Sequence, residues 1–383
     1  MTYVGIDIEQ FVRDPYGSGI QRVLQYLAKQ WPADFVAADF VAPVGEQFAL
    51  LAPAQAAKVL SVPFAPREPG VDLREAVSAA IAECGATLVK AGDLVAIYDS
   101  WLLPEVSYLP SVLDRFSLMS RCMPTAMIGY DTLPMSEPAN YRFRPGAAGE
   151  VSEYFRLLAR ADAVVCISAY ARDAIMTRLR RDPALPITVA HPGGDHLDVR
   201  PRRPPARATF CRIGTLEARK RPVEILRAFA DAVAAGALAD LVFVGGPSAS
   251  DEAINDAVRG AAGPGSAVRW IEGASDDEVR DLVNHAGAFL SIGVEGYGIP
   301  VLEAIRQGTP VLYDGIQPAG DVMAGRGARR VPALAHDDLV RLFVDYSVPD
   351  RLAELAAEVD PEAVPTWADF ARGVAGACRP DRS

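Results

Sequence analysis

Two glutamates eight residues apart, Glu295 and Glu303, mark the densest cluster of chemically useful residues in this 383-residue chain. The string reads Glu-Gly-Tyr-Gly-Ile-Pro-Val-Leu-Glu and joins a strand-like segment to a helix-like one. Gly296 and Gly298 allow a tight turn that brings the backbone close to a ligand. A helix that begins near Pro300 would direct free backbone N–H groups toward that turn, where they favour an anion.

The two carboxylates suggest different partners. Glu295 is expected in the loop beside Tyr297, where it can accept hydrogen bonds from sugar hydroxyls. Glu303 is expected in the first helical turn, within reach of a ribose diol. Compensation of the helix dipole is the alternative for Glu303 alone, but the complete string favours a ligand site.

A basic pair, Arg219 and Lys220, follows a predicted strand that stops at Gly214. A lysine at such a strand end can neutralise a diphosphate and stabilise the charge that grows on it when a glycosidic bond breaks. A solvated basic pair before a helix is the alternative. The glutamate string at the same sheet edge favours the functional interpretation.

Two loops of the first half carry further candidates. Gly17 and Gly19 lie between a predicted strand and helix, where a glycine loop can bind an anion, with Arg22 close by. A plain turn is the alternative. Tyr130 and Asp131 directly follow another predicted strand, so they face the crevice at its carboxyl end. Asp131 could position an acceptor hydroxyl or the donor sugar, or cap a turn.

Strand-like and helix-like segments must position these residues, and they alternate along most of the chain. In the second half, helices are predicted over 222–234, 251–259, 276–286 and 300–307, and strands over 208–213, 241–244, 268–271, 288–292 and 310–313. In the first half, strands are predicted over 3–7, 93–98, 125–130, 163–167 and 187–190. The strands are continuous apolar runs, which is typical of parallel sheets covered by helices on both faces. The predicted fold is α/β, with two Rossmann-like domains facing each other across a cleft.

Composition excludes several classes of protein. A net charge of −11 argues against nucleic acid as a partner. Five cysteines without a C-x-x-C pair indicate free thiols in a reducing compartment, and the four histidines show no metal-binding spacing. The N-terminus does not resemble a signal peptide, and no apolar run reaches the roughly 18 residues of a membrane helix. We therefore expect a cytoplasmic protein. Arginines at 178–181 and 200–203 favour a solvated face, with peripheral contact at the inner face of an anionic membrane as the alternative.

The glutamate string resembles the E-x7-E motif of the family-4 retaining glycosyltransferases, which have the GT-B fold. The segment Ile213-Gly-Thr-Leu-Glu-Ala-Arg-Lys220 is similar to the phosphate-binding segment of these enzymes. Residues 161–168 resemble the strand that closes their N-terminal domain, and Thr366-Trp367 resembles the start of their last helix. The resemblance covers nearly all of the C-terminal half and scattered points of the first.

This resemblance implies that a hexose-type sugar moves from a nucleotide diphosphate donor to a hydroxyl acceptor, with retention of configuration and without a metal or cofactor. It places an acceptor-side domain over 1–198, a linker over 199–207 and a nucleotide-sugar-binding domain over 208–365, with a final helix over 366–383 packing back on the first domain. The catalytic residues are expected to be Asp131, Lys220 and Glu295. Acceptor contacts are expected from Arg22, Tyr130 and Asp131, and donor contacts from Gly17, Gly19, Arg219, Lys220, Glu295, Gly296, Tyr297, Gly298 and Glu303.

Two departures from the family pattern stand out. Thr215 replaces an arginine of some members, which leaves one positive charge fewer at the phosphates unless another residue substitutes. Tyr130 replaces a common histidine. The Gly-Thr-Leu-Glu-x-Arg-Lys and Asp-Thr-Leu-Pro segments favour GDP-mannose and a mannosyltransferase of bacterial surface polysaccharide synthesis, with UDP- and dTDP-sugars as alternatives. The acceptor would be a saccharide or a lipid-linked saccharide; the oligomeric state is left open.

Two rival functions come from other classes. A non-catalytic protein of the same fold could bind sugar nucleotides or act as a scaffold, but the intact glutamate and lysine positions argue against it. A nicotinamide-dependent oxidoreductase needs G-x-G-x-x-G after a strand. Here Gly17-Ser-Gly19 continues as Ile-Gln-Arg, so this rival is disfavoured.

Overall fold

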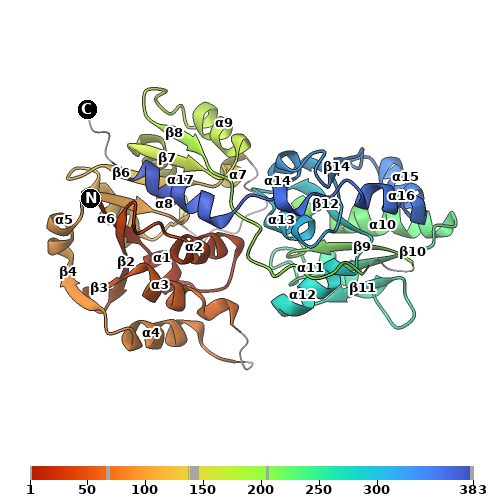
Figure 1. The fold of residues 1–383 in the computed structure, drawn as a ribbon, viewed down its shortest axis with the longest axis horizontal. Helices are drawn as coiled ribbons and strands as arrows, with labels where there is room; N and C mark the ends of the chain where they lie inside the picture. Colours follow the sequence, from red (N-terminus) through yellow and green to blue (C-terminus); the bar gives the residue numbers. More distant parts are fainter. Residues whose placement is uncertain (1, 66–69, 137, 139–145, 204–206, 380–383) are drawn as a thin grey trace. The chain divides into compact units, whose positions relative to one another are not determined.

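The protein forms two compact units, each built around one twisted sheet (Figure 1). The structure is a computed structural model that describes residues 2–65, 70–136, 138, 146–203 and 207–379. The first unit comprises Met1–Thr132, Phe143–Pro192 and Thr366–Ser383. The second comprises Leu133–Arg142 and Gly193–Pro365.

The first unit contains an eight-stranded sheet with the order β4-β3-β2-β1-β5-β6-β7-β8. Every pair of neighbouring strands from β2 to β8 in this order is parallel, so the carboxyl ends of these strands share one edge of the sheet. Its strands are β1 (Tyr3–Asp7), β2 (Ala37–Val44), β3 (Gln47–Leu51), β4 (Thr87–Lys90), β5 (Ser100–Leu103), β6 (Thr125–Gly129), β7 (Ala163–Cys166) and β8 (Ile187–Val189). Its helices are α1 (Glu9–Arg13), α2 (Gly19–Lys29), α3 (Pro53–Leu60), α4 (Leu73–Glu83), α5 (Leu94–Ile97), α6 (Pro110–Met119), α8 (Ala148–Arg160), α9 (Ala169–Arg178) and α17 (Trp367–Ala377).

One edge of this sheet differs from the sequence-based expectation. Strands β3 and β4 pair antiparallel with their neighbours, and neither they nor β2 was predicted. The predicted strand over 93–98 is wrong: Leu94–Ile97 forms the single helical turn α5, and the strand lies at Ser100–Leu103. Asp93 accepts a hydrogen bond from the Lys90 N–H group at 3.3 Å and so favours a turn at this point. A short apolar run suits a strand or a buried helical turn equally well.

The second unit contains a six-stranded parallel sheet with the order β11-β10-β9-β12-β13-β14. This is the 3-2-1-4-5-6 order of the Rossmann fold. Its strands are β9 (Ala208–Ile213), β10 (Ala239–Val244), β11 (Val268–Ile271), β12 (Ala288–Val294), β13 (Val311–Ile316) and β14 (Ala328–Arg330). Its helices are α10 (Pro222–Ala234), α11 (Glu252–Ala261), α12 (Asp276–Asn284), α13 (Ile299–Arg306), α14 (Pro318–Val322), α15 (His336–Tyr346) and α16 (Pro349–Ala356), and α7 (Leu133–Ser136) clusters with this unit.

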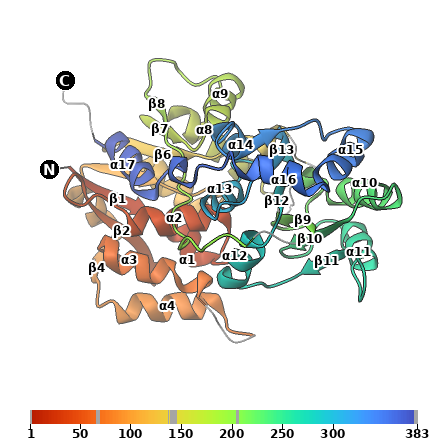
Figure 2. The same ribbon diagram turned by 45° about the vertical axis from the view of Figure 1, so that its right-hand side comes forward.

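Helices cover both faces of the second sheet, as Figures 1 and 2 show. Successive strand residues point to opposite faces. Phe210 and Phe243 therefore pack with α10, α11 and α15 in one buried cluster, whereas Cys211 and Val242 pack with residues of α12 in another. Burial on both faces explains why these strands read as continuous apolar runs. The predicted α/β fold with two Rossmann-like domains is confirmed.

The boundary between the units lies near Pro192, six residues before the end predicted for the first domain. The Gly194 N–H group donates to Pro365 O at 3.0 Å, and the Gly194 backbone lies against Leu302 so closely that a Cβ atom would not fit. Residues 193–198 therefore pack with the second unit. At the other end of the chain, Trp367 of α17 stacks on Tyr26 of α2 within the first unit, with ring centroids 4.9 Å apart.

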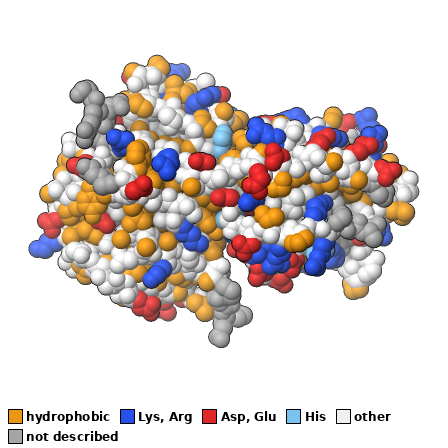
Figure 3. All heavy atoms as spheres, in the orientation of Figure 1, with side chains coloured by type: hydrophobic (Ala, Val, Ile, Leu, Met, Phe, Trp, Pro, Cys, Tyr) orange, Lys and Arg blue, Asp and Glu red, His pale blue; other side chains and the backbone are white. Residues whose placement is uncertain are grey.

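Acidic and basic side chains are interspersed over the face shown in Figure 3, without a continuous basic stripe on that face. This distribution agrees with the negative net charge. No helix among the described residues is both long and apolar enough to cross a membrane.

Candidate functional site

Arg219, Lys220 and Glu295 meet at the carboxyl edge of the second sheet. Arg219 and Lys220 lie in the 3₁₀ turn Ala218–Lys220 after β9, and Glu295 directly follows β12, the neighbouring strand. Lys220 Nζ lies 3.1 Å from Glu295 Oε1, and Arg219 Nη1 lies 2.9 Å from Glu295 Oε2. Arg219 also donates to Val294 O at 2.6 Å and pairs with Glu217. The sequence predicted these three residues as site residues, and the structure brings them into direct contact.

The electrostatics of this group keep Glu295 ionised. Burial alone would raise the pKa of Glu295, but Lys220, Arg219 and Arg212 outweigh it and lower the pKa to about 2. The side chains of Glu295, Arg219 and Lys220 are only 11–18% exposed, so these charges are weakly screened by water. The cluster is therefore a preformed set of opposite charges. Arg219 and Lys220 can exchange their contacts with Glu295 for contacts with an anionic ligand.

Glycines at the strand ends allow the loops to approach this closely. Gly214 has a φ of 121°, and a Cβ atom there would lie 2.7 Å from Lys220 Nζ. Gly293 has a φ of 104°, and a Cβ atom there would collide with Arg219 O. Both glycines are required by backbone conformation and by space. They fix Arg219 and Lys220 against the sheet edge.

We expect Gly293→Ala to destabilise the second unit by about 1–3 kcal/mol, because alanine is strained at this φ, with further loss from the collision with Arg219 O. It should also weaken binding of a nucleoside diphosphate. Gly260→Ala in α11 is the matched control, since no atom lies near its Cβ position. Urea titration of both variants, paired with calorimetric titration of UDP, checks this. Equal stability and UDP affinity in the two variants would contradict it.

Glu303 lies further along its helix than predicted. Helix α13 begins at Ile299, so Glu303 is its fifth residue and lies in the second turn rather than the first. Its Oε1 atom lies 2.9 Å from His196 Nε2, and the His196 side chain is fully buried. Sequence reasoning missed His196, because a single histidine in a glycine-containing segment carries no spacing signal.

The turn between Glu295 and α13 is fixed by buried polar contacts. Gly298 has a φ of 102° at the start of α13, and no side chain caps this helix end. Tyr297 is 5% exposed, and burial raises its pKa. Gln317 donates to Gly293 O at 3.1 Å and accepts from Ser291 at 2.7 Å. Gln317 was not predicted as a site residue, although its hydrogen bonds fix the end of β12 that leads into Glu295 and Gly296.

The predicted glycine loop of the first unit follows α1 at the carboxyl edge of its sheet. The N–H groups of Tyr16 and Gly17 both donate to Gln21 Oε1 at 2.9 Å. These two donors are therefore already used within the loop, which weakens its interpretation as an open anion site. Gly19 is the first residue of α2, and Ser18 caps that helix.

The remaining acceptor candidates lie at the same edge. The Arg22 guanidinium stacks on the Phe64 ring at 4.8 Å. Tyr130 is 4% exposed and donates its hydroxyl proton to Pro104 O at 2.8 Å, so this donor is already engaged. Asp131 follows it at an intermediate depth. The strand order places β1 and β6 on either side of β5, which groups these loops along one edge.

A buried carboxyl group that the sequence did not reveal lies beside these loops. Glu105 follows β5 and accepts a hydrogen bond from the Phe11 N–H group at 3.0 Å. Burial, together with the nearby carboxylates Asp7 and Asp14, raises the pKa of Glu105 to about 8, although the hydrogen bond from Phe11 acts in the opposite direction.

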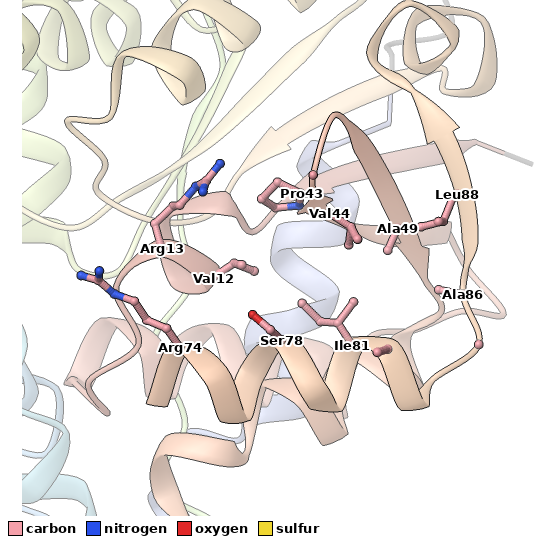
Figure 4. A pocket seen from close by; sticks show the side chains of 13 residues that line it. Val12, Arg13, Pro43, Val44, Ala49, Arg74, Ser78, Ile81, Ala86 and Leu88 are labelled. Carbon is pink, nitrogen blue, oxygen red and sulfur yellow. The ribbon is translucent and has the colours of Figure 1, made fainter. Parts of the chain in front are cut away.

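A groove of about 610 Å³ opens in the first unit beside the carboxyl end of β2 (Figure 4). Apolar side chains such as Val44, Ile81 and Leu88 line it, with Arg13 and Arg74 at one end. Arg74 approaches Asp14 only to 3.9 Å, and its side chain is 68% exposed. The groove combines an apolar wall with the guanidinium groups of Arg74 and of Arg13, the latter paired with Glu9 at 3.2 Å.

Two arginines considered for a membrane surface have structural roles instead. Arg181 is 3% exposed and donates to the carbonyl groups of Leu158, Ala159 and Pro186. Arg202 donates to carbonyl groups at the end of α12 and to Thr309. Buried carbonyl groups need such donors, so these two guanidinium groups are not available to a lipid surface.

Part of the second unit matches a known protein family. Residues 197–325 match the family described as Glycosyl transferases group 1. This region contains the basic pair and both glutamates. The expected enzyme class, a glycosyltransferase, is confirmed at the level of this domain. The comparison with curated proteins gave no match.

Solved structures of similar fold extend the likeness to the whole chain. HepE from Anabaena, in complex with UDP-glucose, has a TM-score of 0.66 and 11% identity, over 98% of this chain and 99% of that one. The lipopolysaccharide outer core galactosyltransferase WaaB has a TM-score of 0.58 and 14% identity, with the same coverage. Sucrose-phosphate synthase from Thermosynechococcus elongatus has a TM-score of 0.60 and 14% identity, over 99% and 95%. At these identities the likeness establishes the GT-B fold.

Proposed function

We propose that the protein transfers a hexose-type sugar from a nucleotide diphosphate donor to a hydroxyl acceptor, with retention of the anomeric configuration. The observation that carries this proposal is the contact of Arg219 and Lys220 with Glu295 at the carboxyl edge of a Rossmann sheet. Ligands bind at this edge in open α/β sheets. The two cations are mounted on a 3₁₀ turn and backed by glycines, so they are positioned before a ligand arrives.

In this mechanism Lys220 and Arg219 bind the diphosphate and stabilise the charge that develops on it as the glycosidic bond breaks. Glu295 exchanges its cation contacts for hydroxyl groups of the sugar. Glu303, which lies 2.9 Å from His196, accepts hydrogen bonds from the ribose diol. The acceptor hydroxyl forms the new glycosidic bond on the face that the diphosphate leaves, and its proton passes to a phosphate oxygen of the leaving group. The cations stabilise that leaving group, so the protein itself need form no covalent bond to the sugar.

The first unit is proposed to bind the acceptor through Arg22 and Asp131, whereas the predicted contact from Tyr130 is disfavoured because its hydroxyl group donates to Pro104 O. The loops that carry these residues share one sheet edge. The groove with Arg13 and Arg74 at its end suits an acceptor that combines an apolar part with an anionic group. A lipid-linked saccharide has this chemistry, which supports it over a free saccharide.

GDP-mannose is the donor we favour, with bacterial surface polysaccharide synthesis as the setting. The support is the likeness of the Gly-Thr-Leu-Glu-Ala-Arg-Lys segment and of the loop after β6 to mannosyltransferase-like relatives. HepE was solved with UDP-glucose and WaaB is a galactosyltransferase, so UDP-sugars are the alternative donors.

Thermal denaturation with a panel of UDP-, GDP- and dTDP-sugars tests the proposal. A donor present at 100 times its Kd should stabilise the folded protein by about 2.7 kcal/mol, and only the matching base should do so. Release of nucleoside diphosphate from that donor, without acceptor, would distinguish an enzyme from a non-catalytic sugar-nucleotide-binding protein. Absence of stabilisation by every member of the panel would overturn the proposal.

A further inference from the structure

We propose that Arg212 supplies the positive charge missing at Thr215 and thereby gives the proposed diphosphate site its net positive charge. This inference rests on the proposed function, because it assigns a role within the same donor site. Arg212 lies near the carboxyl end of β9, three residues before Thr215, and β9 leads into the turn that carries Arg219 and Lys220.

The burial of Arg212 is unusual for a charged side chain without a complete set of partners. The residue is 5% exposed, and its Nη2 atom is buried without a hydrogen-bond partner among the described residues. Leaving a buried charged donor unsatisfied is costly. A strand position on the apolar face of Phe210 is otherwise expected to carry an apolar side chain. A structural role alone therefore does not explain an arginine at this position.

The charges around Arg212 are those of the proposed donor site. Burial lowers the pKa of Arg212 to about 10, and Glu295 and Glu217 act against this decrease, whereas Arg219 adds to it. Arg212 likewise helps to keep Glu295 ionised. The interactions are mutual, so Arg212 belongs electrostatically to the group formed by Glu217, Arg219, Lys220 and Glu295.

The sign of the site depends on this residue. Arg212, Arg219 and Lys220 carry three positive charges, and Glu217 and Glu295 carry two negative ones, which leaves one positive charge. Without Arg212 the group is neutral, because each remaining cation is balanced by a carboxylate that contacts it. A group without net charge attracts a diphosphate less strongly than one that carries a net positive charge. Arg212 is 5% exposed, so it acts on the site through its charge, as a positioning residue, rather than by touching the phosphates.

Binding of UDP, UMP and uridine by calorimetry tests this role. Arg212→Met keeps much of the volume and removes the charge. We expect it to weaken UDP binding roughly tenfold or more, as for one unit charge acting over several ångströms. The affinity for UMP should decrease less than the affinity for UDP, and the affinity for uridine should not change. Arg212→Lys keeps the charge and should stay within about threefold of the natural protein for UDP. If the protein binds GDP or dTDP instead of UDP, the same comparison is made with the diphosphate, the monophosphate and the nucleoside of that base.

Arg202→Met is the matched control. Arg202 is a half-buried arginine of the same unit, and burial lowers its pKa to about 10, as it does for Arg212. Its guanidinium binds Thr309 and carbonyl groups near the end of α12, away from the charge cluster. We expect this variant to lose stability without a change in UDP affinity.

The reverse change keeps the inference testable should Arg212→Met fail to fold. Glu217→Gln removes one negative charge from the group and should strengthen UDP binding several-fold. Unchanged UDP affinity in a folded Arg212→Met variant would overturn the inference, as would an equal loss for uridine or weaker UDP binding by Glu217→Gln. A natural protein that binds no nucleoside diphosphate would instead overturn the proposed function itself.

Discussion

Replacing Lys220 by alanine is expected to lower kcat by ~30- to ~900-fold at saturating donor. Lys220 Nζ lies at the carboxyl edge of the sheet and is fixed between Gly214 and Glu295. A preorganised cation that meets developing charge in a poorly solvated site contributes about 2–4 kcal/mol to transition-state stabilisation. Single-turnover measurement with the donor that stabilises the protein best checks this expectation.

The matched control removes a cation outside the site. Arg227 is an exposed residue of α10, in the helix that follows Lys220. Arg227→Ala should leave kcat unchanged, which separates the loss of a specific contact from the loss of net charge. A near-normal rate for Lys220→Ala at saturating donor would remove this lysine from the mechanism. Unfolding of both variants in urea shows whether the second unit remains folded.

Sequence patterns predicted the second unit well, because burial on both faces leaves a clear signal. The strands Ala208–Ile213 and Val268–Ile271 and the helix Pro222–Ala234 have the predicted bounds. Continuous apolar runs bounded by glycine and proline were sufficient to identify these elements. Glu303 is the fifth rather than the fourth residue of its helix, because α13 starts at Ile299, one residue before the predicted start at Pro300.

The first unit was harder to predict because its edge departs from the parallel pattern. Strand β2 contains Asp39 and Pro43, which resemble loop residues in the sequence. In the structure, Asp39 is 8% exposed and accepts a hydrogen bond from Tyr98 at 3.1 Å, a partner 59 residues away. A polar residue whose partner is so distant in sequence gives no local signal for a strand.

The candidate site shows the same limit. Arg219, Lys220 and Glu295 could be predicted because strand-end residues on adjacent parallel strands meet at one edge. Their direct pairing could not, since it depends on the close approach of two loops. His196 and Arg212 belong to no sequence motif. Neither could be predicted, because each lies near the site residues only in the folded chain.

Replacing Glu303 by alanine is expected to weaken binding of the free nucleoside diphosphate by ~10- to ~150-fold. Hydrogen bonds to a charged group contribute about 1.5–3 kcal/mol each, and this carboxylate would accept from the ribose diol. Its Oε1 atom lies 2.9 Å from His196 Nε2. Calorimetric titration with the nucleotide alone measures this effect without any contribution from sugar or acceptor.

Replacing Glu295 by alanine should have the opposite balance of effects. Glu295 competes with a diphosphate for Arg219 and Lys220, so its removal should strengthen nucleotide binding, as expected for Glu217→Gln, and should not weaken it. Turnover of the intact donor should fall, because the sugar loses a hydrogen-bond acceptor. The pKa of Glu295 lies near 2, so this carboxylate is ionised throughout the pH range of an activity assay and the difference should not depend on pH there. If Glu295→Ala weakens nucleotide binding as much as Glu303→Ala does, the division of this loop into a sugar end and a ribose end fails.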